Sequence, residues 1–385
     1  MANDLTSTGP RSRARATGVR TDRVLPGDVR QRHRGLLLQH LFKAEPLSRA
    51  DLARATGLTR VSVSDVVNEL IELDLVEELG TRPGTRVGKP ATLVTVKYDS
   101  RCIICLDLSD ESEFRGAVTN LEGQILTRAA TQLAGQTGQA AVDKVTALAQ
   151  ELIGLASAPI LGIGVGTPGV VNAQGLVRNA PNLGWQDLDL AQILSDATTY
   201  PAHVANDADT AVLAENTFGE GDGAGLMLVQ ISHGVGAGIL SDGILLRGPE
   251  GTAGEIGHVK VTNEDVLCPC GRTGCLEALL AAPKLRAQIA GKSPQDEAQA
   301  LAAAGVLLGQ VLAPVSQALG VFDIALFGPP ELLAGAFRVA AEETINAATS
   351  HFGDRDVSLR MSALGVDGVL IGAAAHVLGS ELALS

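Results

Sequence analysis

The sequence has few aromatic residues and lacks a long hydrophobic run. Aromatic side chains make up 3% of its 385 residues, so Ala, Leu, Val and Ile must build most of the cores. No run of about 18 apolar residues occurs, and charges occupy the N-terminus where a signal peptide needs an apolar segment. We therefore expect a cytoplasmic protein with no membrane partner. Its length and its 45% hydrophobic content predict roughly two to three folded domains.

Cysteine is also scarce, yet three of the five cysteines lie close together. They follow a histidine at the spacing His-x9-Cys-x-Cys-x4-Cys, and the four residues are His258, Cys268, Cys270 and Cys275. One imidazole and three thiols are the ligands of a closed tetrahedral zinc site, and Gly271 and Gly274 let the backbone turn tightly around the ion. The alternative is a group of buried small side chains or a disulfide, but nothing indicates an oxidising compartment. We predict a structural zinc ion.

Two carboxylates, Glu255 and Glu277, bracket this motif without being needed as metal ligands. The run Ala253–His258, followed by Cys-x-Cys-Gly-x-x-Gly-Cys-Leu-Glu at 268–277, resembles the signature of the ROK family, which groups sugar kinases with sugar-responsive repressors. For residues 98–385 the resemblance implies an α/β domain of the two-lobed actin and sugar-kinase type, which is ribonuclease H-like. In the repressors, a winged helix-turn-helix domain precedes it.

Charge is distributed unevenly between the two parts of the chain. Residues 1–97 hold 16 Lys and Arg against 11 Asp and Glu, whereas residues 98–385 hold 14 against 32. A basic front part suggests that it meets a polyanion, although basic tails are common. Residues 1–26 are rich in Arg, Thr, Ser and Gly without apolar periodicity, so we expect a disordered basic tail.

Residues 27–97 have the pattern of a winged helix-turn-helix domain. Ser48 is predicted to cap a short helix over 49–56, and Thr59 to cap a second helix over 60–73 after a Gly-Leu turn. Strands over 76–79 and 91–96 then flank a basic loop that would serve as the wing. In this motif the second helix enters the major groove of double-stranded DNA. The residues expected to contact DNA are Arg49, Arg60, Ser62, Ser64, Asn68, Arg82, Arg86 and Lys89. The alternative is an ordinary helical packing unit beside a solvated basic hairpin.

The remainder of the chain alternates strands and helices in α/β order. Strands are expected at 103–107, 115–119, 160–165, 203–205, 226–231, 324–327 and 357–361, with a helix near 138–155. Cys102 and Cys105 lie three apart in the first strand, so they should face opposite sides of the sheet as core residues. The Gly-rich stretch 234–238 is expected to form tight turns.

The resemblance also implies which residues hold a sugar. Asn206-Asp207, after the strand at 203–205, resembles the catalytic Asn-Asp pair of the family's kinases, in which the aspartate is the general base. Taken alone, such a pair more often caps a helix. Carried over residue by residue, the effector-binding set is Asn182, Asn206, Asp207, Glu255, His258 and Glu277. His258 would contact zinc through one ring nitrogen and face the sugar with its other side.

Three stretches depart from the nucleotide-binding motifs of the family's kinases. The Asp-x-Gly-Gly-Thr hairpin is replaced by Asp107-Leu108-Ser109-Asp110-Glu111, which puts carboxylates where phosphates would bind. Gly-Thr-Gly-x-Gly is replaced by residues 232–236, Ser-His-Gly-Val-Gly, and the adenosine loop ends in Pro329-Pro330. ATP binding is therefore not expected, and Asp207 would occupy a vestigial base position without catalytic function.

Together these features predict a DNA-binding transcriptional regulator, most simply a repressor, that binds an operator as a homodimer or tetramer and is nucleoid-associated when bound. A sugar or sugar derivative would be its effector. Two alternatives stay open: an active ROK sugar kinase with an appended DNA-binding domain, and a constitutive DNA-binding protein with an inert sugar cleft.

Overall fold

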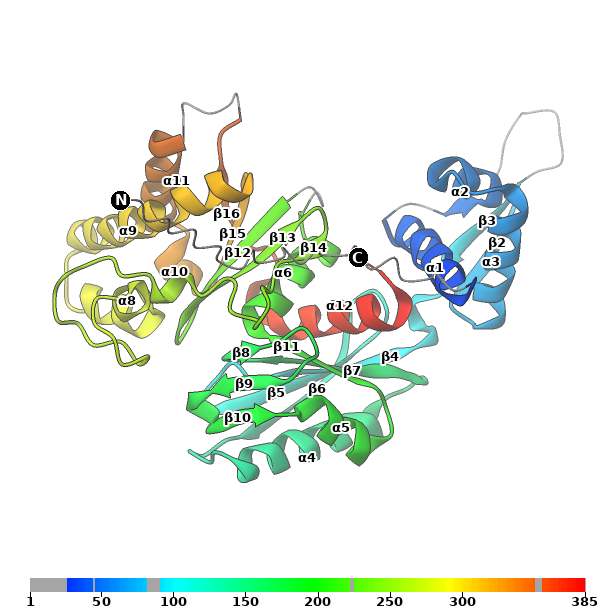
Figure 1. The fold of residues 1–385 in the computed structure, drawn as a ribbon, viewed down its shortest axis with the longest axis horizontal. Coiled ribbons are helices and arrows are strands. Elements are labelled where there is room, and N and C mark those ends of the chain that lie inside the picture. Colours follow the sequence, from blue (N-terminus) through cyan, green and yellow to red (C-terminus); the bar gives the residue numbers. More distant parts are fainter. Residues whose placement is uncertain (1–25, 44–45, 82–90, 222–224, 350–354, 385) are drawn as a thin grey trace, which may run out of the picture.

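The computed structural model describes residues 26–43, 46–81, 91–221, 225–349 and 355–384 (Figure 1). The expected basic tail before residue 26 lies outside these ranges. The expected wing contacts Arg82, Arg86 and Lys89 also lie outside the described residues.

Residues 26–97 form an N-terminal module of three helices and a small sheet. Its elements are α1 (Pro26–Lys43), β1 (Leu47–Ser48), α2 (Arg49–Thr56), α3 (Arg60–Glu72), β2 (Val76–Thr81) and β3 (Thr92–Val96), with the sheet order β1-β3-β2. Ser48 caps α2 in a capping box with Asp51, and the Thr59 hydroxyl accepts from the Ser62 backbone N–H at the start of α3. The two predicted capped helices are confirmed.

Residues 98–206 form the first lobe of the α/β domain. Its main sheet has the order β11-β7-β4-β5-β6, and its strands are β4 (Cys102–Asp107), β5 (Glu113–Thr119), β6 (Ile125–Gln132), β7 (Ile160–Thr167) and β11 (Ala202–Asn206). One face packs on α4 (Gln139–Leu155) and α5 (Leu190–Thr198). A small sheet adds β8 (Val170–Val171), β9 (Val177–Ala180) and β10 (Trp185–Leu188). Cys102 and Cys105 belong to cores on opposite faces of β4, as predicted.

The second lobe has a sheet of the same topology. Its order is β14-β13-β12-β15-β16, formed by β12 (Gly225–Ile231), β13 (Val235–Ser241), β14 (Ile244–Leu245), β15 (Asp323–Phe327) and β16 (Ser358–Met361). Its helices are α7 (Leu276–Leu280), α8 (Ala282–Ile289), α9 (Pro294–Leu319), α10 (Pro330–Leu333) and α11 (Ala336–Thr349). In each sheet three parallel strands continue into an antiparallel hairpin.

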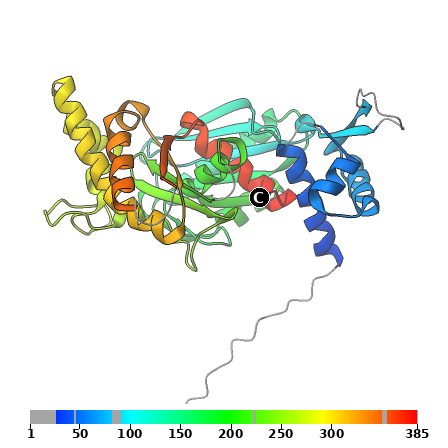
Figure 2. The same ribbon diagram turned by 90° about the horizontal axis from the view of Figure 1, so that it is seen from above.

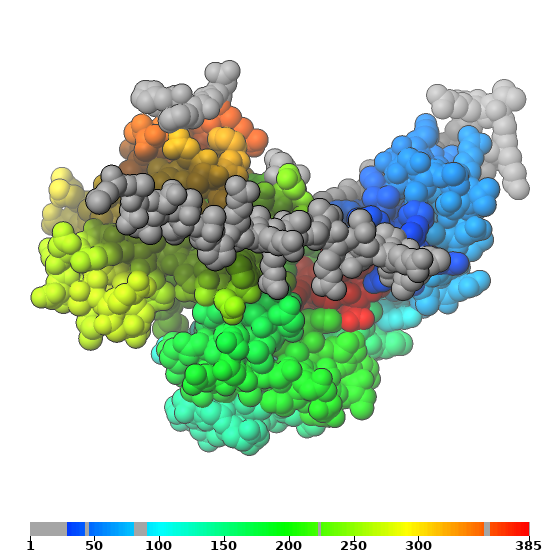
Figure 3. Space-filling model, viewed as in Figure 1, coloured from blue at the N-terminus to red at the C-terminus, as the bar shows by residue number. Residues whose placement is uncertain are grey.

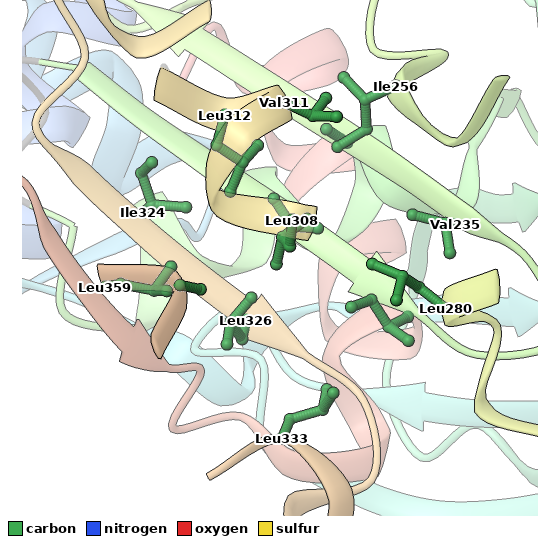
Figure 4. Packing of buried hydrophobic residues seen from close by; sticks show 14 of the residues in the cluster. Val235, Ile256, Leu280, Leu308, Val311, Leu312, Ile324, Leu326, Leu333 and Leu359 are labelled. Atoms are coloured by element: carbon green, nitrogen blue, oxygen red, sulfur yellow. The ribbon is translucent and has the colours of Figure 1, made fainter. Parts of the chain in front are cut away.

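Helix α9 is long and apolar enough to cross a membrane by length and composition. Its residues Leu308, Val311 and Leu312 instead pack against Ile324 and Leu326 of β15 in the core of the second lobe (Figure 4). We conclude that α9 is a core helix, because it packs along α11 and over this sheet.

Two further helices, α6 (Asp207–Phe218) and α12 (Gly368–Leu382), join the lobes and the N-terminal module. Helix α12 packs on β4 and β7, α6 packs on β12 and β13, and the two helices pack on each other. The end of α12 also meets α1, and the two share one hydrophobic core (Figures 1 and 2). In Figure 3 the N-terminal module forms a separate blue lobe that touches the rest of the molecule beside red α12.

One sequence prediction for this part was wrong. The stretch 234–238 does not form tight turns, because Val235–Ser241 is strand β13, paired with β12 along its whole length. Gly238 is required by packing, because a Cβ there would lie 2.3 Å from the carbonyl oxygen of Ala208 in α6. Glycine at that position therefore allows a helix to approach the sheet closely.

Candidate metal centre and polar cleft

The four predicted metal ligands come together at the edge of the second lobe. One ligand atom from each of His258, Cys268, Cys270 and Cys275 lies within 4.8 Å of all the others. The Sγ atoms of Cys270 and Cys275 are 3.7 Å apart, and Nδ1 of His258 is 3.7 Å from Sγ of Cys268. Zinc–sulfur bonds of about 2.3 Å at tetrahedral angles place two sulfurs about 3.8 Å apart. The cluster therefore has the dimensions of a tetrahedral ion site.

The backbone around the cluster turns at two glycines. Gly271 and Gly274 have φ of 85° and 78°, which side-chain-bearing residues rarely adopt. A Cβ on Gly274 would also lie 2.1 Å from the carbonyl oxygen of Thr262. A hydrogen bond from the backbone N–H of Arg272 lowers the pKa of the Cys270 thiol to about 6, and this favours the thiolate that a metal requires.

His258 connects the cluster to the neighbouring cleft. Its Nδ1 faces the thiols, whereas its Nε2 lies 3.5 Å from Oε2 of Glu255. If Nδ1 binds a metal, Nε2 carries the proton and can donate to that carboxylate or to a ligand. A metal bound by the cluster would thereby fix the orientation of one wall of the cleft.

A cavity of about 480 Å³ lies between the two lobes beside the cluster. All six residues of the predicted effector-binding set line it, namely Asn182, Asn206, Asp207, Glu255, His258 and Glu277. The sequence places them in four separate stretches, and the fold brings them to one space. Such a wall of carboxylates, amides and an imidazole suits a ligand with several hydroxyl groups.

Asn206 and Asp207 stand where β11 passes into α6. The Asn206 side chain caps this helix by accepting from the backbone N–H groups of Ala208 and Asp209, and it donates to the carbonyl of Gly169. The pair thus caps a helix and also lines the cleft. Burial, followed by repulsion from Asp107, raises the pKa of Asp207 to about 7.

The core of the second lobe anchors the carboxylates on the other side of the cavity. Ile256, next to Glu255, points into the cluster that contains Val235 and Leu280 (Figure 4). Oε2 of Glu277 accepts from the backbone N–H of Val235 at 3.0 Å. Burial raises the pKa of Glu255, His258 lowers it, and Glu277 raises it further.

Several polar residues of the cavity were not assigned to the site by the sequence analysis, among them Asp209, Gln230 and His233. Gln230 donates to Oδ2 of Asp207 at 2.9 Å, so it positions that carboxylate. The available signal was a glutamine inside the otherwise apolar strand 225–231. Its side chain is 4% exposed, and burying a polar side chain is costly unless it forms hydrogen bonds.

The hairpin between β4 and β5 forms the far end of the cavity. Ser109 and Glu111 line it, and the amide of Asn182 donates to Oε1 of Glu111 at 2.7 Å. The carboxylate of Asp110 accepts from the backbone and hydroxyl of Ser112 and so closes the turn itself. Of the carboxylates expected at the phosphate position, Glu111 therefore faces the cavity, whereas Asp110 stabilises the turn of the hairpin by hydrogen bonds.

Of the residues expected to contact DNA, Arg60 and Asn68 are exposed on α3, and Ser62 and Ser64 are partly exposed. The Ser62 hydroxyl lies 2.9 Å from that of Thr59. Arg49 is engaged within the module, since its guanidinium pairs with Glu78 and donates to Asn68. Among the expected contacts that the structure describes, Arg60 is the arginine that is exposed and not held in an ion pair, so it can reach a phosphate or a base.

Residues 103–307 match the model of the ROK family. This chain belongs to the ROK family. A xylose repressor of Caldicellulosiruptor bescii is 32% identical to this ROK protein over 258 residues, which cover 65% of this chain and 63% of the repressor. A glucokinase of Halalkalibacterium halodurans is 44% identical over 126 residues, or 32% of this chain and 38% of the kinase.

A solved structure shows the same fold over nearly the whole ROK protein. It is a ROK family transcriptional regulator, a homologue of the E. coli Mlc protein, with a TM-score of 0.79 at 23% identity. The match covers 92% of this chain and 98% of that one. The expected architecture, a helix-turn-helix module followed by a two-lobed sugar-kinase-like domain, is therefore confirmed.

Proposed function

We propose that this ROK protein is a DNA-binding transcriptional repressor that is released from its operator by a sugar or sugar derivative. The observation that carries the proposal is that six polar residues converge in one cleft beside the group of possible metal ligands. The same chain also has a helix-turn-helix module. Its likeness to repressors supports the same function.

Zinc is the metal we propose for the cluster. Three thiols and one imidazole complete a tetrahedral shell, so no open position is left for catalysis. When bound, zinc would fix the positions of His258 and of the segment that leads to Glu277. The role of the ion is thus to hold the shape of the cleft.

Loss of ATP binding is supported by the hairpin at the far end of the cleft. Glu111 presents a carboxylate to the cavity, where its Oε1 accepts from the amide of Asn182. A triphosphate entering there would meet a like charge. We therefore propose a non-catalytic, kinase-like effector domain in which Asp207 accepts a hydrogen bond from a sugar hydroxyl.

Helices α6 and α12 offer a route from the cleft to the N-terminal module. Helix α6 begins at Asp207 in the cleft and packs along α12, whose last turn meets α1. A sugar that favours the closed arrangement of the lobes would move these helices and change the spacing of two modules in a homodimer or tetramer. The effect depends on different sugar affinities of the two states.

The second candidate is a sugar kinase with an appended DNA-binding module. Its support is the 44% identity with a glucokinase over 126 residues. A kinase would be stabilised by ATP and would form ADP with a sugar, whereas the proposed repressor would show neither effect.

The test is retention of pooled genomic DNA fragments by the full-length, zinc-loaded protein, with and without common sugars, at fixed salt. Specific fragments should be retained and then released by one sugar. Arg60→Ala should abolish retention, while Arg286→Ala, an exposed arginine of α8 in the second lobe, should not. Retention that no sugar alters would indicate a constitutive DNA-binding protein. Failure to retain any fragment at low salt would contradict the proposal.

A further inference from the structure

A second and larger cavity, of about 710 Å³, lies between the N-terminal module and the α/β domain. Helix α1 contributes one wall, and α6, α12 and the segment after β14 contribute the others. Its size is within the range of about 300–1,000 Å³ that is typical of small-molecule sites. It is separate from the cleft, since the two cavities share no lining residue.

The charge of this cavity is opposite to that of the cleft. Arg32 of α1 and Arg247 of the α/β domain line it, and none of its lining residues is an Asp or a Glu. This is notable in a chain with a net charge of −13. Arg247 has an acidic partner outside these lining residues, Asp209, whose Oδ2 lies 3.8 Å from its Nε. Burial raises the pKa of Asp209 to about 7, so this carboxylate neutralises the arginine only in part near neutral pH.

The wall also contains polar groups that lack a partner among the described residues. Asn216 of α6 is 7% exposed, and its Oδ1 has no hydrogen-bond donor. His376 of α12 accepts from Arg247 through Nε2 at 3.4 Å, which places its ring proton on Nδ1, and that atom also lacks a partner. Both atoms are buried behind the surface of the cavity, so they make its wall polar without being direct contacts of a ligand.

The rest of the wall is apolar. Leu36 of α1 and Leu213 of α6 line the cavity together with Leu245 and Leu384. Such a surface favours the carbon skeleton of an organic molecule over a bare inorganic ion. A carboxylate or phosphate group would reach the two arginines, while the skeleton would lie against the leucines.

We infer that this cavity, here called the joint cavity, binds a small organic anion between Arg32 and Arg247. The two arginines belong to the N-terminal module and the α/β domain, so one ligand would bridge both parts. Its binding would favour the arrangement in which the two guanidinium groups face the same space. The joint cavity would therefore accept a second, charged effector, distinct in chemistry from a ligand of the cleft.

The test is calorimetric titration of the full-length, zinc-loaded protein with succinate, citrate and glycerol 3-phosphate, with glycerol as the neutral control. No DNA or sugar is present, so the result does not depend on the proposed repressor function. At least one anion should bind with one site per chain, and glycerol should not. Comparison of succinate and citrate with glycerol 3-phosphate shows whether the cavity prefers carboxylate or phosphate groups.

Arg32→Gln is the decisive variant because Arg32 is exposed on α1 and its loss should leave the fold intact. It should weaken binding at least about tenfold, as should Arg247→Gln, since each removes a charged hydrogen bond. Arg60→Gln, on the exposed face of α3, is the matched control and should bind normally. Binding that Arg32→Gln leaves unchanged, binding lost in Arg60→Gln, or no binding of any anion would overturn the inference.

Discussion

Two cavities lie at opposite ends of α6, and they differ in charge. The cleft at the start of the helix is lined by five carboxylates, those of Glu111, Asp207, Asp209, Glu255 and Glu277. The joint cavity near its end is lined by two arginines and no carboxylate. Carboxylates accept hydrogen bonds from hydroxyl groups and repel phosphates, whereas guanidinium groups bind anions. The ligands proposed for the two cavities therefore differ in charge: a neutral polyol for the cleft and an organic anion for the joint cavity.

The two cavities are also physically linked. Asp209 lines the cleft, and its carboxylate lies 3.8 Å from Arg247 in the wall of the joint cavity. The four substitutions below test the two cavities independently of each other or test the contact between Asp209 and Arg247.

Removal of a metal ligand should have the largest effect. Cys270→Ser should lose the bound zinc, lower the free energy of unfolding by several kcal/mol and abolish sugar binding, because structural zinc contributes directly to folding. Metal content, thermal unfolding and sugar titration measure the three effects. Cys102→Ala, which removes a buried thiol of β4 outside the cluster, should keep its zinc. Unchanged zinc content in Cys270→Ser would exclude the assigned ligand set.

Glu277→Gln should weaken sugar binding in the cleft without affecting anion binding in the joint cavity. Loss of a charged hydrogen bond costs about 1.5–3 kcal/mol, so affinity for the sugar that releases DNA should fall roughly 10- to 100-fold. Anion binding should remain unchanged. Glu331→Gln, an exposed glutamate of α10, should bind the sugar normally. Equal sugar affinity in the two variants would remove Glu277 from the proposed effector set.

Asp207→Asn should change how stability depends on pH. The pKa of Asp207 is raised from 3.8 to about 7, so between these values the native state holds a proton that the unfolded chain releases. The stabilisation that this retained proton gives the native state is fully present below pH 3.8 and is lost as the pH rises to about 7. The free energy of unfolding falls by up to about 1.4 kcal/mol per pH unit over this range. Urea unfolding from pH 5 to pH 8 should show a smaller decline in Asp207→Asn than in wild type. Asp196→Asn, on the exposed face of α5, should behave like wild type.

Asp209→Asn should have the smallest effect, and it acts on the link between the cavities. Removing the partial ion pair frees Arg247 and should strengthen anion binding in the joint cavity by a few-fold, consistent with about 0.2–1 kcal/mol for a weak pair. The gain should be larger at pH 8 than at pH 6, because the pKa of Asp209 is about 7. Titration at both pH values measures it. A gain independent of pH would show that Asp209 does not influence Arg247 through its charge.

Local signals predicted much of the fold and part of the site. Ser48 and Thr59 indicated the starts of α2 and α3 because side-chain capping depends only on neighbouring residues. The spacing of the histidine and cysteines likewise predicted the metal cluster, since close ligands form a site within one stretch of chain. The proposed sugar set came from resemblance, because its residues lie in four separate stretches.

Features that depend on distant packing escaped prediction. Strand β6 was not recognised, because its small and polar residues alternate in burial but have weak apolar character. Strand β13 has glycine at position 238 because helix α6 packs closely against it there, and its sequence alone resembled a turn. The joint cavity could not be foreseen, since Arg32 and Arg247 line one cavity only when the N-terminal module packs against the α/β domain.

The contact between α1 and the end of α12 limits how this protein can be re-engineered. A Cβ at Gly35 would lie 2.5 Å from the backbone carbonyl oxygen of Ala383, a position that no side-chain rotation can relieve. A chimera that carries the N-terminal module of a different protein would therefore pack correctly against α12 only if it keeps glycine at this position. The absence of one Cβ at position 35 thus limits which other N-terminal modules can be joined to this α/β domain.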